Sequence, residues 1–215
     1  MRSQIIEQTE SYVRNELRED ATGHDWYHVD RVRHNAIHIC EQEKVGDSFI
    51  IEMSALLHDI SDEKLNESAE KGEEKLELFL QAILIPNEAK NHIKQIISSI
   101  SYKGGRKTDL LSVEAKIVQD ADRLDAIGAI GIARAFAYGG KKGQPIYDPS
   151  INVREEMTLE EYRKGKSSSV HHFYEKLLKL KELLNTETAK RMSNKRQQMM
   201  EAFLEQFYQE WNGQL

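Results

Sequence analysis

Two histidines and two aspartates are the residues of this chain whose types and spacing could do chemistry. They are His28, the adjacent pair His58-Asp59, and Asp122. Imidazole nitrogens and carboxylate oxygens together can hold one divalent cation, and this donor set suits Mn2+, Fe2+, Mg2+, Ni2+ or Zn2+. Four protein ligands on an octahedral ion leave two positions for water or a phosphate oxygen. Such an ion can lower the pKa of a bound water and neutralise the charge that builds on a phosphoryl group.

The adjacent pair needs a particular place in the backbone. Successive residues of a helix point about 100° apart, so His58 and Asp59 converge on one ion most easily where a helix ends. The apolar residues before them predict a helix over about 48–58, which delivers the pair at its C-terminal end. In the helix expected over about 26–43, His28, Arg31 and Asn35 share one face at three- and four-residue steps.

Taken singly, these residues are weak signals. A His-Asp dipeptide is common by chance, and a histidine on a helix more often packs or faces solvent than binds a metal. Asp122 also lies between Asp120 and Asp125, and three acids in one helix equally fit a solvated face.

Three segments together resemble a known family. They read His-x-x-Arg-Val at 28–32, Leu-Leu-His-Asp-Ile at 56–60, and Asp-Ala-Asp-Arg-Leu-Asp-Ala at 120–126. In this order and spacing they resemble the core motif of the HD superfamily of metal-dependent phosphohydrolases. Further runs are similar to the small bacterial HD-domain hydrolases that include the YpgQ and YedJ proteins, and the resemblance covers roughly residues 20–212. These runs are 24–32, 120–134, 139–149 and 172–178.

The resemblance implies metal ligands at His28, His58, Asp59 and Asp122. It also implies hydrolysis of nucleoside triphosphates to monophosphate and pyrophosphate by water attacking phosphorus, with His58 and Asp59 at the reaction centre. Branches with two metals add further histidines, and His92 is the only one between Asp59 and Asp122. We therefore expect one divalent ion, with Mn2+ favoured and Mg2+, Fe2+, Ni2+ or Zn2+ as alternatives.

Substrate contacts are predicted with less support. A phosphate ester needs cations, and arginine suits bidentate phosphate binding. The candidates are Arg31, Arg123, Lys176 and His24, although most of the lysines and arginines of any chain face water. Asp25 is a candidate for acid/base chemistry, with N-capping of the helix at Trp26 as the competing interpretation.

Apolar residues recur at helical spacing along nearly the whole chain, which predicts an all-α fold. We expect a single HD domain over residues 1–215, with a metal-binding core at about 20–130 and C-terminal helices at about 155–214 packing on it. Residues 138–153 carry strong turn signals and could hold a short strand pair. The predicted helices cover about 2–18, 26–43, 48–58, the region around 76–83, the region from 86 to 100, and 110–125, 173–184 and 192–211.

Composition limits the partners. The formal net charge of −6 argues against a general nucleic-acid binder, which needs a basic face. The N-terminus lacks the apolar run of a signal peptide, and no segment approaches the roughly 20 apolar residues that span a bilayer. The single cysteine, Cys40, fits a reducing cytosol. We expect a cytoplasmic monomer or homodimer that binds a nucleotide or another small phosphorylated substrate.

Other functions remain open at this point. On the same fold, the chain could be a 5′-nucleotidase, or a phosphodiesterase for cyclic nucleotides or guanosine tetraphosphate. A two-iron oxygenase would need further histidine ligands. A non-enzymatic helical module could keep the metal or a nucleotide for structure or regulation.

Overall fold

The structure is a computed structural model that describes residues 2–18, 23, 25–62, 65–100, 110–154 and 165–214. Helices make up its regular structure, and no strand occurs in the described residues, which confirms the predicted all-α fold. Two compact units are present. The first contains the described residues up to 100 together with 110–122, and the second contains the described residues from 123 onward. The expectation of a single domain stays a prediction.

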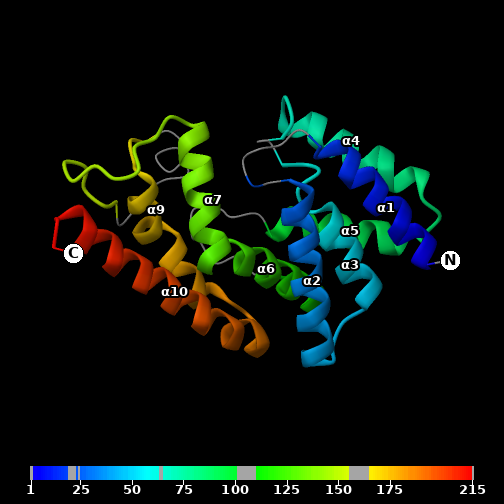
Figure 1. The fold of residues 1–215 in the computed structure, drawn as a ribbon. Helices are drawn as coiled ribbons and strands as arrows, with labels where there is room; N and C mark the ends of the chain where they lie inside the picture. Colours follow the sequence, from blue (N-terminus) through cyan, green and yellow to red (C-terminus); the bar gives the residue numbers. More distant parts are fainter. Residues whose placement is uncertain are drawn as a thin grey trace. The chain divides into compact units, whose positions relative to one another are not determined.

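The first unit is built around one short, apolar helix (Figure 1). This helix, α3 (Ser48–Leu57), is buried along nearly its whole length and contacts α1, α2 and α5. A helix this apolar is stable only when other elements cover most of its surface. The other helices of this unit are α1 (Arg2–Glu16), α2 (Trp26–Glu43), α4 (Ala69–Ala82), α5 (Asn87–Ile100) and α6 (Val113–Asp125), whose last three residues belong to the second unit.

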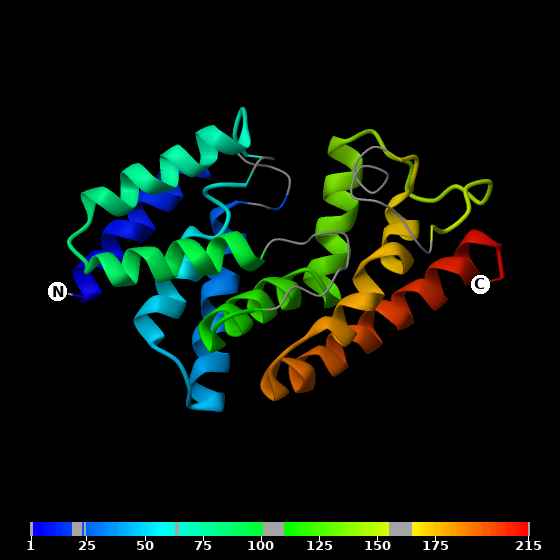
Figure 2. The ribbon, with the colours of Figure 1, turned by 180° about the vertical axis from the view of Figure 1, so that it is seen from behind.

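Helix α4 runs beside α1, as both ribbon views show (Figures 1 and 2). The rings of Tyr12 and Phe79 stack with centroids 4.1 Å apart, and the Lys75 ammonium lies 2.9 Å from the Glu16 carboxylate. These contacts hold α4, which follows the His58-Asp59 pair in the chain, against the N-terminal helix.

Polar caps determine where the helices around the predicted ligands begin. The side chains of Asp25, Asp47 and Ser68 each accept a hydrogen bond from a backbone amide in the first turn of α2, α3 and α4, respectively. Such a cap satisfies an amide that the helix cannot. At the other end of α2, Lys44 adopts a left-handed conformation with φ 56°, and its amide donates to the Cys40 carbonyl. The registers of α2 and α3 are thereby fixed.

The second unit packs α7 (Gly128–Lys141), α9 (Ser169–Glu175) and the 3-10 helix η1 (Leu177–Leu183) with the long α10 (Glu187–Trp211). Phe136 of α7, Phe173 of α9 and Phe203 of α10 meet with ring centroids 5.7–6.2 Å apart. Aromatic pairs at these separations add to the burial of their area.

Two expectations for this unit are wrong. Residues 142–154 contain no strand; instead, the carbonyls of Pro145 and Ile146 accept hydrogen bonds from the amides of Ser169 and Val170 at the start of α9. The loop backbone therefore bonds to the first turn of α9 rather than to a second strand. The helix expected over 173–184 is interrupted at Lys176 (φ −138°, ψ −59°) and continues as η1.

Among the described residues, no helix combines the length and the apolar content that crossing a bilayer requires.

Candidate metal centre

His28 lies in the first turn of α2, and its side chain is almost completely buried. Its backbone amide donates to the Asp25 side chain over 2.9 Å, so the capping residue also fixes the start of the turn that carries the imidazole. The neighbouring residues Val29 and Val32 are fully buried and hold this face of α2 in the interior of the first unit. The helix therefore presents His28 to the interior of this unit.

His58 is the C-terminal cap of α3 and Asp59 is the first residue of the turn that follows, as predicted. The Nδ1 atom of His58 lies 2.8 Å from the Ala55 carbonyl oxygen. A carbonyl can only accept, so Nδ1 carries the proton and the Nε2 atom of a neutral His58 bears a lone pair. A backbone contact thus selects the tautomer that a metal ligand at Nε2 requires.

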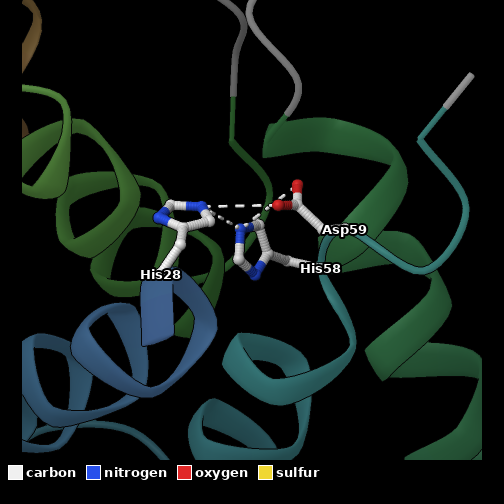
Figure 3. A group of neighbouring side chains, drawn as sticks. All are labelled: His28, His58 and Asp59. Carbon is white, nitrogen blue, oxygen red and sulfur yellow. Dashed lines mark hydrogen bonds and ion pairs between the residues drawn. The ribbon is translucent and has the colours of Figure 1, made fainter. Parts of the chain in front are cut away.

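These three side chains converge on one point (Figure 3). The two Nε2 atoms of His28 and His58 lie 3.2 Å apart. Asp59 places Oδ2 3.4 Å from the His28 Nε2 and Oδ1 3.3 Å from the His58 Nε2. All three residues are buried, and one ligand atom from each lies within 4.8 Å of the others.

Asp122, the fourth predicted ligand, lies at the same point. Its Oδ1 is 3.6 Å from the His28 Nε2 and 4.0 Å from the His58 Nε2, and its side chain is more exposed than the other three. The Asn35 side-chain amide donates to the Ala121 carbonyl over 3.4 Å, which ties α2 to the residue before Asp122. The more exposed carboxylate forms the solvent side of the group.

The donor set fits a divalent cation. For ligands at about 2.1 Å from an octahedral ion, neighbouring ligand atoms are about 3.0 Å apart and opposite ones about 4.2 Å apart. The separations of 3.2–3.6 Å and 4.0 Å between these atoms lie in that interval. The His58 Nε2 lone pair and two carboxylates meet at one point, where a shared positive charge would neutralise the carboxylates. Nitrogen and oxygen donors without thiolates suit the metals predicted above.

In the described part of the chain, the structure does not place the remaining predicted residues in the group formed by His28, His58 and Asp59. Their roles in catalysis or substrate binding stay predictions. Asp25 caps α2, and Arg31 is half-buried on that helix. Arg123 is buried in the second unit, where its guanidinium donates to the Leu183 carbonyl. Lys176 caps the end of α9 in the same unit, and His24 lies outside the described residues.

Two features near the centre were not predicted. The Ala55 carbonyl that orients His58 is a backbone group, which a side-chain pattern cannot reveal. Asn66 donates to the carbonyls of Ile60 and Asp62 just after the His-Asp pair. A single asparagine in a polar segment carries no distinctive sequence signal.

Comparison with known proteins shows the family of the chain. The model of the HD domain matches residues 25–127, which include all four converging residues. The YpgQ protein of Bacillus subtilis is 37% identical over 209 residues, which cover 96% of this chain and 94% of YpgQ. The crystal structure of YpgQ in complex with ADP aligns with a TM-score of 0.76 and 33% identity, covering 95% of this chain and 97% of that one.

Two further crystal structures are similar over nearly their full length. An HD-superfamily hydrolase from Bacillus thuringiensis is 48% identical with a TM-score of 0.76, covering 99% of each chain. A protein from Lactobacillus plantarum is 38% identical with a TM-score of 0.87, covering 98% of each chain. With its converging His28, His58 and Asp59, the chain belongs to the HD superfamily of hydrolases.

Proposed function

We propose that this protein is a metal-dependent phosphohydrolase that cleaves nucleoside triphosphates to the monophosphate and pyrophosphate. The observation that carries the proposal is the convergence of two imidazole Nε2 atoms and the Asp59 carboxylate within 3.2–3.4 Å, with Asp122 at 3.6 Å from His28. In an HD-superfamily hydrolase, a buried donor set of this kind supports a metal-assisted reaction at phosphorus.

His28, His58, Asp59 and Asp122 would hold one divalent ion. When bound, such an ion supplies a Lewis acid that activates water and stabilises negative charge on a phosphoryl group. The chain itself contributes preorganisation. The Ala55 carbonyl holds the His58 ring in one tautomer, and the Asp25 cap holds the turn that carries His28. Ligands fixed in this way need little rearrangement during the reaction.

The reaction is an in-line displacement. Water attacks the α-phosphorus, a new P–O bond forms, and the bond from that phosphorus to the α,β-bridging oxygen breaks. Pyrophosphate leaves with the bonding electron pair, and the proton of the attacking water is transferred to a base. Asp59 is the proposed orienting group for that water, because its carboxylate lies at the centre and can accept a hydrogen bond from water.

A nucleotide is the proposed substrate class because a relative of similar length and fold has been crystallised with one. The ADP complex of YpgQ shows nucleotide binding by that protein, and we carry the ligand class over to this chain. Arg31 is the first candidate for a phosphate contact, since it lies one turn after His28 on α2 and its guanidinium could bind phosphate oxygens in a bidentate manner.

The test is product analysis on the full chain. Protein stripped by a chelator and resupplied with Mn2+ is incubated with nucleoside triphosphates, monophosphates and cyclic monophosphates, and the products are separated by anion exchange. We expect monophosphate and pyrophosphate in equal amounts from one or more triphosphates. Orthophosphate from monophosphates would replace the proposal with a nucleotidase. Absence of any product with Mn2+, Mg2+, Fe2+ or Ni2+ would contradict hydrolysis of nucleotides.

Two variants on the same helix test whether the hydrolytic activity depends on the metal centre. His28→Ala should lower kcat/KM by about a hundredfold or more, because losing a ligand exceeds the tenfold to hundredfold cost of losing a supporting contact. His34→Ala, on the same helix, is the control, since the His34 side chain is 70% exposed and its contacts are with Asp30. Equal activities in the two variants would separate the reaction from this centre.

A further inference from the structure

Asp59 can reach the metal centre only if the backbone leaves the helical path after His58. His58 ends α3 in a helical conformation (φ −59°, ψ −33°), and the next side chain of a continuing helix would point about 100° away. The Asp59 carboxylate nevertheless lies 3.3 Å from the His58 Nε2. The backbone after His58 must therefore be held in a turn that returns Asp59 to the centre.

That turn covers residues 57–62. The amide of Ile60 donates to the Leu57 carbonyl, and the amide of Asp62 donates to the Asp59 carbonyl. These bonds close the turn on itself, and the Leu65 amide just after it also donates to the Asp62 carbonyl. Two carbonyls of the turn, those of Ile60 and Asp62, are also contacted by a side chain from outside it. Buried or half-buried carbonyls of this kind need partners.

Asn66 supplies both of these contacts. Its Nδ2 atom lies 2.9 Å from the Ile60 carbonyl oxygen and 2.8 Å from the Asp62 carbonyl oxygen. One primary amide has two N–H donors, and here both are used on carbonyls of the same turn. Asn66 is half-buried, so these bonds are partly protected from competing water.

Gly72 lets α4 approach the same turn, while its own amide donates to the Ser68 carbonyl. It is a buried residue in the first turns of α4, and a Cβ atom placed on it would lie 2.7 Å from the Ser61 carbonyl oxygen and 3.0 Å from the Asn66 Nδ2. Glycine therefore allows the α4 backbone to approach the turn and Asn66 together. A methyl group at this position must push the turn, the asparagine or the helix away.

We propose that Asn66 and Gly72 are positioning residues that hold the 57–62 turn, and through it Asp59, in the geometry that binds a divalent metal. The inference builds on the metal centre of the proposed function. It assigns a role to two residues outside the metal-ligand set. Supporting residues of this kind typically contribute tenfold to hundredfold in metal affinity.

The test measures Mn2+ affinity rather than turnover. Metal-stripped full-length variants are titrated with Mn2+ by calorimetry, at a temperature at which circular dichroism shows each variant folded. Asn66→Ala and the nearly isosteric Asn66→Asp, which turns a donor of two hydrogen bonds into an acceptor, should raise the Kd about 10-fold to 100-fold. Gly72→Ala should act in the same direction. Gly140→Ala is the matched control, because Gly140 is a helical glycine with open space around its Cβ position, and its Kd should equal that of the wild type.

The outcomes separate this inference from the proposed function. A raised Kd in the Asn66 and Gly72 variants supports the positioning role, even if the wild type hydrolyses no nucleotide. An unchanged Kd in both Asn66 variants overturns it, even if the wild type is an active pyrophosphohydrolase. Loss of folding in both Asn66 variants also overturns it, since their contribution would then be general stability. A wild type that binds no Mn2+ is titrated with Mg2+, Fe2+ and Ni2+, and binding of none of these ions overturns both proposals.

Discussion

The Nε2 atoms of His28 and His58 face each other across 3.2 Å, and the His58 Nδ1–H is committed to the Ala55 carbonyl. The neutral His58 ring therefore has no proton to offer at Nε2, where it meets a second imidazole and two carboxylates. A cation at the shared point would neutralise the two carboxylates and bind the His58 lone pair. The stability of the folded protein should therefore depend on divalent metal.

Divalent metal should stabilise the folded protein. A ligand at a hundredfold excess over its Kd contributes about 2.7 kcal/mol to the free energy of unfolding, which raises Tm by several degrees in a chain of this size. Differential scanning calorimetry with Mn2+ and with a chelator measures the shift. His58→Ala should abolish it, whereas His34→Ala should retain it. An equal shift in His58→Ala would place the bound metal elsewhere.

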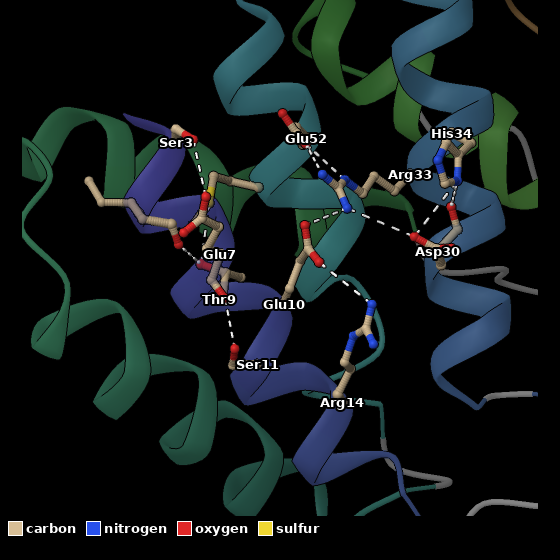
Figure 4. Close-up of polar contacts among 12 residues, drawn as sticks. Ser3, Glu7, Thr9, Glu10, Ser11, Arg14, Asp30, Arg33, His34 and Glu52 are labelled. Carbon is tan, nitrogen blue, oxygen red and sulfur yellow. Dashed lines mark hydrogen bonds and ion pairs between the residues drawn. The ribbon is translucent and has the colours of Figure 1, made fainter. Parts of the chain in front are cut away.

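Arg33 should be important for the stability of the first unit. Its guanidinium lies 2.6 Å from a carboxylate oxygen of Glu10 on α1 and 2.6 Å from one of Glu52 on α3, so it links three helices (Figure 4). Arg33→Met removes the near cation from both mostly buried carboxylates and leaves Glu10 only the more distant Arg14, at 3.7 Å. We expect a loss of about 3 kcal/mol in urea unfolding.

The control for Arg33 is another arginine–carboxylate pair in the same unit. Arg2 and Asp47 lie 3.3 Å apart, but their side chains are 66% and 42% exposed. Exposed pairs contribute little because water screens them, so Arg2→Met should change stability far less than Arg33→Met. Equal losses would show that burial does not determine the strength of these pairs.

Glu175 should make stability depend on pH in the acid range. Burial raises the pKa of its carboxyl, but hydrogen bonds from Arg154 (2.7 Å to each oxygen) and Ser167 (2.9 Å) outweigh burial, so the pKa lies below its ordinary value of 4.5. Because the pKa is lower in the folded state, the ionised Glu175 carboxylate stabilises the folded protein at pH values above the pKa of the unfolded state. This stabilisation is lost as the pH falls through the pKa of the folded state.

The variant Glu175→Gln tests this directly. It removes the charge while keeping the shape, so it should be less stable than the wild type at pH 7. The difference in free energy of unfolding should shrink as pH falls from about 4.5 toward the lower folded pKa. Urea titrations between pH 7 and pH 3 give the comparison. A difference that stays constant over this range would show that the Glu175 charge contributes nothing.

Local periodicity was enough to predict most of the fold. The apolar stripe of Val29, Val32 and Ala36 predicts a helix over about 26–43, and α2 is found at Trp26–Glu43. The position of His58-Asp59 at a helix end was also predictable, because it follows from the length of the apolar run before it. Cys40 lies among the apolar residues of α2 and is buried, as such a position predicts.

Contacts between segments distant in the chain could not be predicted. The strand pair expected in 138–153 fails because the carbonyls of Pro145 and Ile146 bond to the start of α9. The close approach of Gly72 to the 57–62 turn depends likewise on packing, whereas Asn66 contacts that turn over only four and six residues. One asparagine or glycine in a sequence does not reveal which carbonyl it will meet.

The most direct test of the central claim is the stoichiometry of bound metal at this centre. Metal-stripped wild type, Asp59→Asn and His34→Ala are each dialysed against Mn2+, and the metal per chain is measured by inductively coupled plasma mass spectrometry. We predict one equivalent per chain in the wild type and in His34→Ala, and a marked loss in Asp59→Asn. One equivalent retained by Asp59→Asn, or none bound by the wild type, would contradict the assignment of His28, His58, Asp59 and Asp122 as a metal centre.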